Sequence, residues 1–251
     1  MDATAQSKKI AIITGGGSGI GLAIAERFVS AGILTIIIGR DQQKLAAARQ
    51  QLGENCHPLA HDLNDLASLP ALVEQIISRF GRIDILVNNA GINMKKEFQD
   101  VTDEEFDYIL HTNLRAVFAL SREVVKTMLP RRSGNIINIS SMASQYGIPK
   151  VIAYTASKAA IEGMTRAMAV ELSPEGILVN CIAPGFIATD MSARALNSDP
   201  ERKQKVFSRT PLGRLGDPGD IGNAALFLAS GQASYLTGVV LPVDGGNSIG
   251  F

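Results

Sequence analysis

A tyrosine and a lysine four residues apart are the side chains of this sequence best suited to acid–base chemistry. Tyr154 and Lys158 lie in the segment YTASK, and residues at this spacing share one face of a helix, so both can point at one ligand. A phenol with a pKa of about 10 is a poor base at neutral pH, but nearby positive charges favour the phenolate. Lowering that pKa to about 7 takes roughly 4 kcal/mol, which two positive charges in a dry site can supply. Taken alone, the pair would be better explained as two residues on an exposed helix surface.

Two further polar residues accompany this pair. Ser141 follows a predicted strand and precedes Tyr154 by 13 residues, so its hydroxyl can bond the same substrate oxygen; Ser140 is the rival, and the spacing favours Ser141. Asn113 falls on the apolar stripe of a predicted helix, where its amide must be satisfied. It either marks a helix kink with a bound water that relays protons to Lys158, or is a core asparagine bonded to neighbouring backbone.

A glycine-rich turn lies near the start of the chain. The sequence TGGGSGIG at 14–21 connects a predicted strand to a predicted helix, the arrangement in which helix amides and the helix dipole receive a pyrophosphate. The glycines are spaced as Gly15, Gly19 and Gly21 rather than as GxGxxG. A mere tight turn is the alternative. The chain holds 24 glycines in all, which suggests further places where backbone approaches a ligand closely.

The end of the second predicted strand bears on the choice of cofactor. An NAD enzyme places an acid there to bond the ribose 2′-hydroxyl, whereas this chain has Gly39 followed by Arg40. A guanidinium pairs with a 2′-phosphate in a charge-assisted bond, so we expect NADP(H), with NAD(H) possible. Ser18 offers no basic side chain to help, and Arg40 could instead stack on adenine or face solvent. Asp41 is predicted to cap the next helix.

Seven short runs rich in apolar residues alternate with longer segments of helical periodicity. The predicted strands are 9–14, 34–39, 56–60, 84–88, 135–140, 177–183 and 239–243. The predicted helices are 20–32, 41–51, 66–80, 103–129, 154–173 and 218–230. Several strands are apolar almost throughout, as in parallel sheets covered on both faces. The pattern predicts an α/β fold with a single Rossmann-type, doubly wound parallel sheet of about seven strands, residues 1–251 forming one domain. The irregular segment 186–217 is either a substrate-covering lid or a surface connection.

Composition excludes several classes of function. The 251 residues hold 24 Lys plus Arg and 24 Asp plus Glu, a balance that argues against a nucleic-acid partner. No apolar run reaches the 18 or so residues of a membrane helix, and no signal peptide is visible. Cys56 and Cys181 form no CxxC motif, so no metal site is expected, and two free thiols suit a reducing cytoplasm.

The motifs together resemble the short-chain dehydrogenase/reductase family over nearly the whole chain. The resemblance rests on TGGGSGIG, Asp62-Leu63, NNAG at 88–91, Asn113, Ser141, YTASK, Pro184-Gly185 and VDGG at 243–246. It implies hydride transfer between a nicotinamide and a secondary alcohol or ketone. Tyr154 would be the acid/base, Lys158 would bind ribose hydroxyls and tune Tyr154, Ser141 would orient the substrate oxygen and Asn113 would support the relay. With Arg40 added, the expected cofactor residues are Gly15, Gly17, Ser18, Gly19, Ile20, Gly21, Arg40, Asp62, Leu63, Asn89, Gly91, Tyr154, Lys158, Gly185, Ile187 and Thr189.

The substrate and the assembly follow less directly. Segments 88–98, 140–147 and 209–220 look most like gluconate 5-dehydrogenase and related sugar-acid or polyol enzymes, and Lys95 or Lys96 could reach a substrate carboxylate; a solvated pair is the alternative. A 3-oxoacyl-[acyl-carrier-protein] reductase is the other candidate. It would need a basic docking patch beside the cleft, for which Arg131 and Arg132 are available, although Glu171 and Glu175 dilute their charge. A sensor or scaffold that binds NADP(H) without chemistry is the alternative of another class, although such a protein has no use for the Tyr154–Lys158 pair. The resemblance also implies a homotetramer.

Overall fold

A seven-stranded parallel sheet forms the centre of the computed structural model, which describes residues 8–189, 192 and 200–250. Its order is β3-β2-β1-β4-β5-β6-β7, and every pairing is parallel. The strands are β1 (Ile10–Thr14), β2 (Leu34–Gly39), β3 (Cys56–Ala60), β4 (Ile85–Asn88), β5 (Gly134–Ile139), β6 (Ile177–Pro184) and β7 (Val240–Val243). The order runs outward from β1 in both directions, which is the doubly wound α/β arrangement predicted from the sequence.

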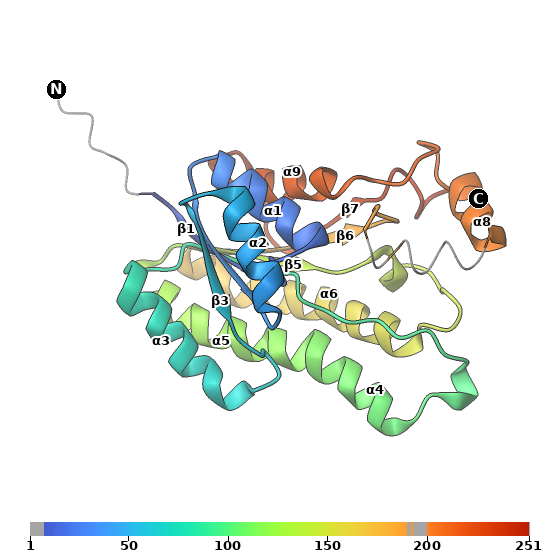
Figure 1. Cartoon of the computed structure of the whole chain (residues 1–251), viewed down its shortest axis with the longest axis horizontal. Helices are drawn as coiled ribbons and strands as arrows, with labels where there is room; N and C mark the ends of the chain where they lie inside the picture. Colours follow the sequence, from blue (N-terminus) through green and yellow to red (C-terminus); the bar gives the residue numbers. More distant parts are fainter. Residues whose placement is uncertain (1–7, 190–191, 193–199, 251) are drawn as a thin grey trace.

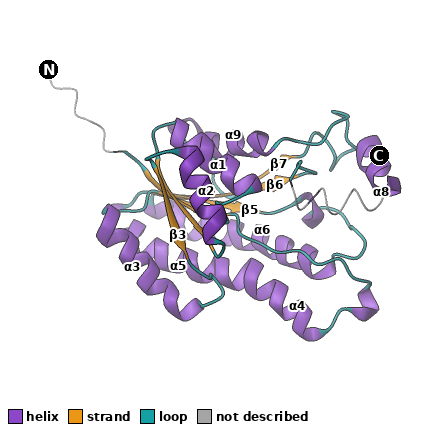
Figure 2. Cartoon of the chain, in the orientation of Figure 1, coloured by secondary structure: helices purple, strands orange, loops and turns teal. Residues whose placement is uncertain are grey.

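Helices cover both faces of the sheet (Figures 1 and 2). One face carries α1 (Gly19–Ser30), α2 (Gln42–Leu52) and α9 (Pro218–Ala229); the other carries α3 (Leu69–Phe80), α5 (Ala116–Met128) and α6 (Ile152–Leu172). Strand β1 is mostly apolar because both of its faces are covered. Ala11 and Ile13 pack into the core under α1, α2 and α9, while Ile10 and Ile12 pack into the core under α3, α5 and α6, since successive side chains of a strand point to opposite faces.

The structure departs from the sequence prediction in two segments. The predicted helix 103–129 is interrupted: α4 (Asp103–Leu110) passes through a π-helical turn, η3 (His111–Arg115), into α5. The segment 186–217, predicted to be irregular, contains a helix, α8 (Pro200–Arg209). Residues 190–191 and 193–199 of that segment lie outside the described part of the chain.

Short 3-10 turns complete the connections. They are η1 (Leu66–Ser68), η2 (Phe98–Asp100), η4 (Leu129–Arg131), η5 (Met142–Ser144), η6 (Ser173–Glu175) and η7 (Gly231–Ala233). Two helix starts follow the usual capping chemistry. Asp41 accepts from the backbone N–H groups of Gln43 and Lys44 at the start of α2, as expected, and Thr102 forms a capping box with Glu105 at the start of α4.

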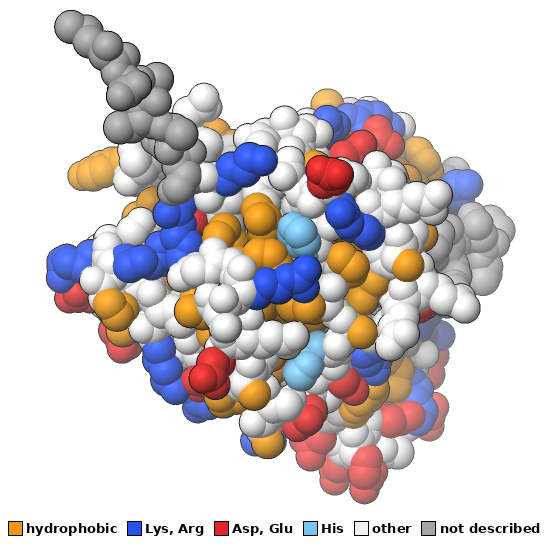
Figure 3. Space-filling model, turned by 60° about the vertical axis from the view of Figure 1, so that its left-hand side comes forward, with side chains coloured by type: hydrophobic (Ala, Val, Ile, Leu, Met, Phe, Trp, Pro, Cys, Tyr) orange, Lys and Arg blue, Asp and Glu red, His pale blue; other side chains and the backbone are white. Residues whose placement is uncertain are grey.

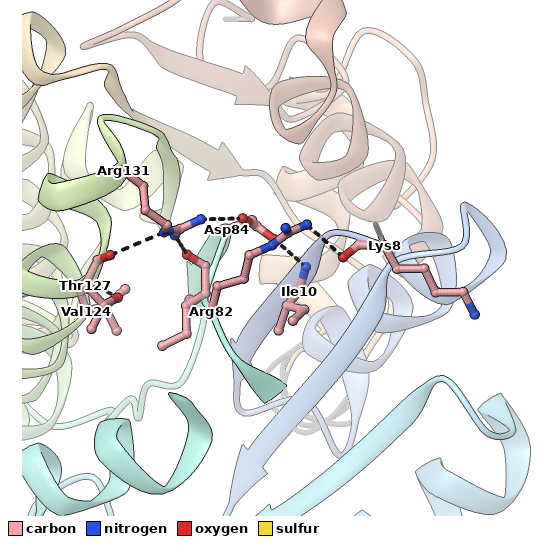
Figure 4. A network of polar contacts seen from close by, with 8 residues as sticks. Lys8, Ile10, Arg82, Asp84, Val124, Thr127 and Arg131 are labelled. Carbon is pink, nitrogen blue, oxygen red and sulfur yellow. Dashed lines mark hydrogen bonds and ion pairs between the residues drawn. The ribbon is translucent and has the colours of Figure 1, made fainter. Parts of the chain in front are cut away.

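A carboxylate at the amino ends of the strands joins three segments (Figure 4). Asp84 accepts from the Ile10 amide at 2.8 Å and from the guanidinium groups of Arg82 and Arg131, each at 2.9 Å. Arg132, next along the chain, pairs with Glu175. Because both arginines precede β5, they lie at the edge opposite the strands' carboxyl ends. Arg131 and Arg132 therefore do not form a docking patch beside a cleft at the carboxyl ends of the strands.

Charges are mixed over the surface. On the face drawn in Figure 3, Lys and Arg side chains lie among Asp and Glu side chains instead of forming one continuous basic patch. Among the described residues, no helix combines the length and the apolar character that crossing a membrane would require.

Candidate active site

A pocket of about 380 Å³ opens at the carboxyl ends of the strands. Its walls come from the segments that follow β1, β4, β5 and β6 and from the start of α6. In open parallel sheets this edge is where ligands bind, and the crevice lies where the strand order reverses, between β1 and β4. The expected residues that line the pocket are Gly15, Ser18, Gly19, Ile20, Asn89, Gly91, Ser141, Tyr154, Lys158, Gly185, Ile187 and Thr189.

The glycine turn brings backbone unusually close to backbone. Gly15 and Gly19 have φ angles of 67° and 54°, which side-chain-bearing residues rarely adopt. A Cβ on Gly21 would lie 2.3 Å from the carbonyl oxygen of Gly15. Ser18, at the start of α1, makes no capping hydrogen bond with its side chain, so the first amides of the helix face the pocket without that partner. This arrangement fits a dinucleotide pyrophosphate.

A threonine that the sequence reasoning did not identify holds this turn against the neighbouring loop. The Thr14 hydroxyl accepts from the amides of Asn89 and Ala90 at 2.9 and 3.0 Å, and the Asn89 side chain donates to the Thr14 carbonyl at 3.0 Å. Thr14 ends β1 and Asn89 follows β4, so the bonds bridge the two sides of the crevice. A buried hydroxyl at the end of an apolar strand was the available signal, since such a group must find partners.

Ser141 and Tyr154 meet inside the pocket. The Ser141 side chain acts as a hydrogen-bonding neighbour that lowers the pKa of Tyr154. Its Oγ accepts from the Ala143 amide at 3.1 Å, which caps η5. Ser140, the rival, is buried and directs its hydroxyl to Glu162 and to the carbonyl of Lys158. The geometry therefore favours Ser141 over Ser140 as the serine available to a substrate.

Lys158 is buried beside Tyr154. Its Nζ donates to the Ile139 carbonyl at 2.8 Å and lies 5.6 Å from the centre of the Tyr154 ring. Burial lowers the pKa of Lys158 to about 8, an effect partly opposed by Cys181. Burial raises the pKa of Tyr154, and the hydrogen bond with Ser141 opposes that rise. Desolvation of the phenolate thus outweighs the effect of the Ser141 hydrogen bond, so the lower pKa expected for Tyr154 does not follow from these side chains alone.

Asn113 lies in the π-helical turn and its amide is fully engaged. It accepts from the Ile92 amide at 2.8 Å and donates to the Ile92 carbonyl at 2.9 Å and to Ser157 at 3.1 Å. Both features weighed from the sequence are present, the distorted helix and the bonds to neighbouring backbone. A Cβ on Gly91 would lie 3.2 Å from Asn113 Oδ1 and 3.5 Å from Lys158 Nζ, so the two side chains converge there.

The remaining expected cofactor residues lie outside the pocket wall. Gly17 packs near Lys44, and Arg40 is exposed directly after β2. Asp62 and Leu63 follow β3, where Asp62 accepts from the Asn64 amide and Leu63 packs against the core. Arg40 follows the carboxyl end of β2, and Asp62 and Leu63 follow that of β3, on the side of the sheet beyond β1.

The pocket is also lined by side chains that sequence reasoning missed. Among them are Asn93, Met142, Ala143, Ile148, Val151 and Phe186. Most are apolar, and their spacing in loops carries no periodic signal. Lys96 was expected to reach a carboxylate of the substrate, but it pairs with the Glu105 side chain at 2.7 Å. As far as the chain is described, neither Lys95 nor Lys96 lines this pocket.

Comparisons with known proteins identify the family. A family model described as enoyl-(acyl carrier protein) reductase matches residues 15–248. The 3-oxoacyl-[acyl-carrier-protein] reductase FabG of Vibrio harveyi is 42% identical, over 95% of this chain and 96% of its own. A protein of Agrobacterium tumefaciens, provisionally named a gluconate dehydrogenase, superimposes with a TM-score of 0.93 at 33% identity, covering 97% of both chains.

A third comparison concerns the cofactor. The structure of an actinorhodin polyketide ketoreductase variant with NADPH superimposes with a TM-score of 0.91 at 31% identity, over 98% of this chain and 99% of that one. Fold, motifs and relatives coincide over almost the whole length. The chain belongs to the short-chain dehydrogenase/reductase family and is an oxidoreductase that acts on alcohol or ketone groups.

Proposed function

We propose that this protein reduces a ketone to a secondary alcohol with NADPH, using Tyr154 as the proton donor. The observation that carries the proposal is the meeting of Ser141, Tyr154 and Lys158 in one pocket beside the glycine turn. NADPH, when bound, supplies the hydride. Tyr154 gives its proton to the carbonyl oxygen while Ser141 holds that oxygen by a hydrogen bond.

Lys158 and Asn113 support the proton transfer. Lys158, with a pKa of about 8, is largely protonated at pH 7, and its ammonium favours the tyrosinate left after transfer. Its second task is to bind ribose hydroxyls of the cofactor. Asn113 fixes the Ile92 backbone next to Lys158 and supports the relay that returns a proton to Tyr154.

Replacement of the tyrosine hydroxyl tests the reaction. In Tyr154→Phe we expect kcat to fall by at least about 10²-fold, the lower range for a general acid, with NADPH affinity nearly unchanged. Tyr235→Phe, in a fully exposed tyrosine, is the matched control and should keep wild-type activity. Steady-state kinetics and NADPH fluorescence titration measure both. Turnover retained by Tyr154→Phe would rule out the assignment.

NADP(H) is the cofactor we assign, on the strength of Gly39 and the exposed Arg40 at the end of β2. The described residues give Arg40 no ion pair, so its guanidinium is available to a 2′-phosphate. The expected residues that line the pocket, together with Gly17, Gly21, Asp62 and Leu63, hold the remainder of the dinucleotide. The likeness to a ketoreductase structure with NADPH supports this choice.

For the substrate, we assign a ketone on an apolar chain, such as a 3-oxoacyl thioester. Met142, Ala143, Ile148, Val151 and Phe186 give the pocket an apolar lining, and Lys96 is engaged by Glu105. The relative in Vibrio harveyi carries the corresponding name. A sugar acid or polyol, the first expectation from sequence, is the second candidate, supported by the likeness to the Agrobacterium protein. NADPH oxidation with 3-oxoacyl thioesters, ketoses and keto-acids distinguishes them: turnover confined to keto-acids and ketoses would overturn the apolar assignment.

A homotetramer remains part of the proposal. Phe118 on α5 and Val170 on α6 are half or more exposed, which suits helix faces that pack against other copies. Light scattering gives the mass in solution directly.

A further inference from the structure

A buried carboxylate lies directly behind the candidate active site. Glu162 is on α6, one turn after Lys158 and two turns after Tyr154, and only 9% of it is exposed. Among the described residues no lysine or arginine pairs with it. Its partners are two hydroxyls: Oε1 accepts from Ser140 Oγ at 2.9 Å and also bonds Ser144 Oγ. No motif of the family pattern used above includes this glutamate.

The two serines flank Ser141 on both sides. Ser140 directly follows β5, and Ser144 ends η5, the turn that Ser141 caps. Ser144 Oγ lies 2.6 Å from the Ser141 carbonyl, and Ser140 Oγ lies 3.2 Å from the Lys158 carbonyl. One carboxylate oxygen thus connects both ends of the loop carrying Ser141 to the helix carrying Tyr154 and Lys158.

This arrangement is costly for the fold. A carboxylate taken out of water without a cationic partner loses hydration that hydroxyl hydrogen bonds replace only in part, and an apolar side chain would fill the same place without that cost. Such a group is therefore expected where its hydrogen bonds fix a geometry. Here the geometry they fix is the position of Ser141 relative to Tyr154.

We propose that Glu162 is a positioning residue for the reaction, which holds Ser140 and Ser144 so that the Ser141 hydroxyl stays aligned with Tyr154 Oη. This proposal rests on the function proposed above. Without the carboxylate, the 140–144 loop is released from α6 and Ser141 moves. Misplacement by about 1 Å of a group that orients the substrate costs up to about 10²-fold in rate, while the glycine turn that receives the cofactor's pyrophosphate belongs to a different loop.

Three variants separate positioning from simple stability. Glu162→Leu removes the acceptor, Glu162→Gln keeps an acceptor oxygen, and Glu171→Leu changes an exposed glutamate of the same helix. We expect Glu162→Leu to lower kcat by about 10- to 100-fold with unchanged affinity for NADPH. Glu162→Gln should recover most of kcat, and Glu171→Leu should match the wild type.

A double-mutant cycle with Ser141→Ala makes the test specific. If Glu162 acts through Ser141, Glu162→Leu causes little further loss in the Ser141→Ala background, because both changes remove the same interaction. If Glu162→Leu lowered kcat by the same factor in the wild-type and the Ser141→Ala backgrounds, the proposal would be overturned. A wild-type kcat in Glu162→Leu would overturn it as well. Should Glu162→Leu fail to fold, Ser144→Ala enters the same cycle, with the same pattern expected.

The two proposals fail in different ways. A fully active Tyr154→Phe would overturn the proposed function itself. An inactive Tyr154→Phe together with an unimpaired, folded Glu162→Leu would leave that function standing and remove only the positioning role.

Discussion

At the scale of single residues, cofactor choice turns on two neighbouring positions, Gly39 and Arg40. A Cβ on Gly39 would meet nothing closer than Leu45 Cδ2 at 3.7 Å, an ordinary contact. Its φ is not in the left-handed region, so a side chain fits without strain. An acid at this place would accept from a ribose 2′-hydroxyl and repel a 2′-phosphate.

Gly39→Asp should therefore reverse the preference from NADPH to NADH. We expect kcat/KM with NADPH to fall by at least about tenfold, the equivalent of about 1.4 kcal/mol, while kcat/KM with NADH rises. Arg40→Ala should weaken NADPH alone. Asp65→Asn, an exposed position beyond the cofactor residues, is the control. Wild-type preference for NADH would show that Arg40 does not read a 2′-phosphate.

At the scale of elements, the sequence predicts those parts that depend on local pattern. The strands were placed within one or two residues because buried parallel strands are apolar on both faces, and Asp41 was placed as a cap because capping chemistry is local. The π-helical turn at His111–Arg115 was not foreseen as such, since it depends on contacts of Asn113 with Ile92 and Ser157. Glu162 escaped notice for the same reason: its serine partners lie 18 and 22 residues away.

The π-helical turn gives the next prediction. Asn113→Ala leaves the half-buried Ile92 N–H and carbonyl without their partner, and the loss of two hydrogen bonds at about 0.5–1.5 kcal/mol each costs about 1–3 kcal/mol. The free energy of unfolding should fall by that amount, and amide exchange at Ile92 should become faster. Asn223→Ala, on the exposed side of α9, should change neither. Equal exchange rates at Ile92 in wild type and variant would contradict the role of the asparagine in holding the loop.

At the scale of the whole molecule, the two ends of the parallel strands have separate roles. The pocket lies at the carboxyl ends of the strands. Asp84 lies at their amino ends, where it holds the start of β1, the segment before β4 and the end of η4 together (Figure 4). Burial raises the pKa of Asp84, but hydrogen bonds from the Ile10 amide, Arg131 and Arg82 more than offset it, so the pKa is lowered overall. Because the pKa of Asp84 is lowered in the folded protein, its contribution to the free energy of unfolding should depend on pH.

The sign of that dependence follows from the direction of the shift. A carboxylate with a lowered pKa in the folded state stabilises the protein above its unfolded pKa, near 3.8, and this contribution disappears as the pH falls through the folded value. Asp84→Ala should lower the free energy of unfolding by about 1.5–3 kcal/mol at pH 7, the range for hydrogen bonds to charged groups. Urea unfolding at pH 7, 5 and 3 should show the difference in the free energy of unfolding between wild type and variant shrinking only at the lowest pH. The control Asp100→Ala, at an exposed site, should show little difference from the wild type at any pH.

A difference between wild type and Asp84→Ala that stays constant down to pH 3 would mean that Asp84 acts through packing and not through its charge. Because the pocket lies at the other edge, kcat of the folded variant at pH 7 should remain that of the wild type.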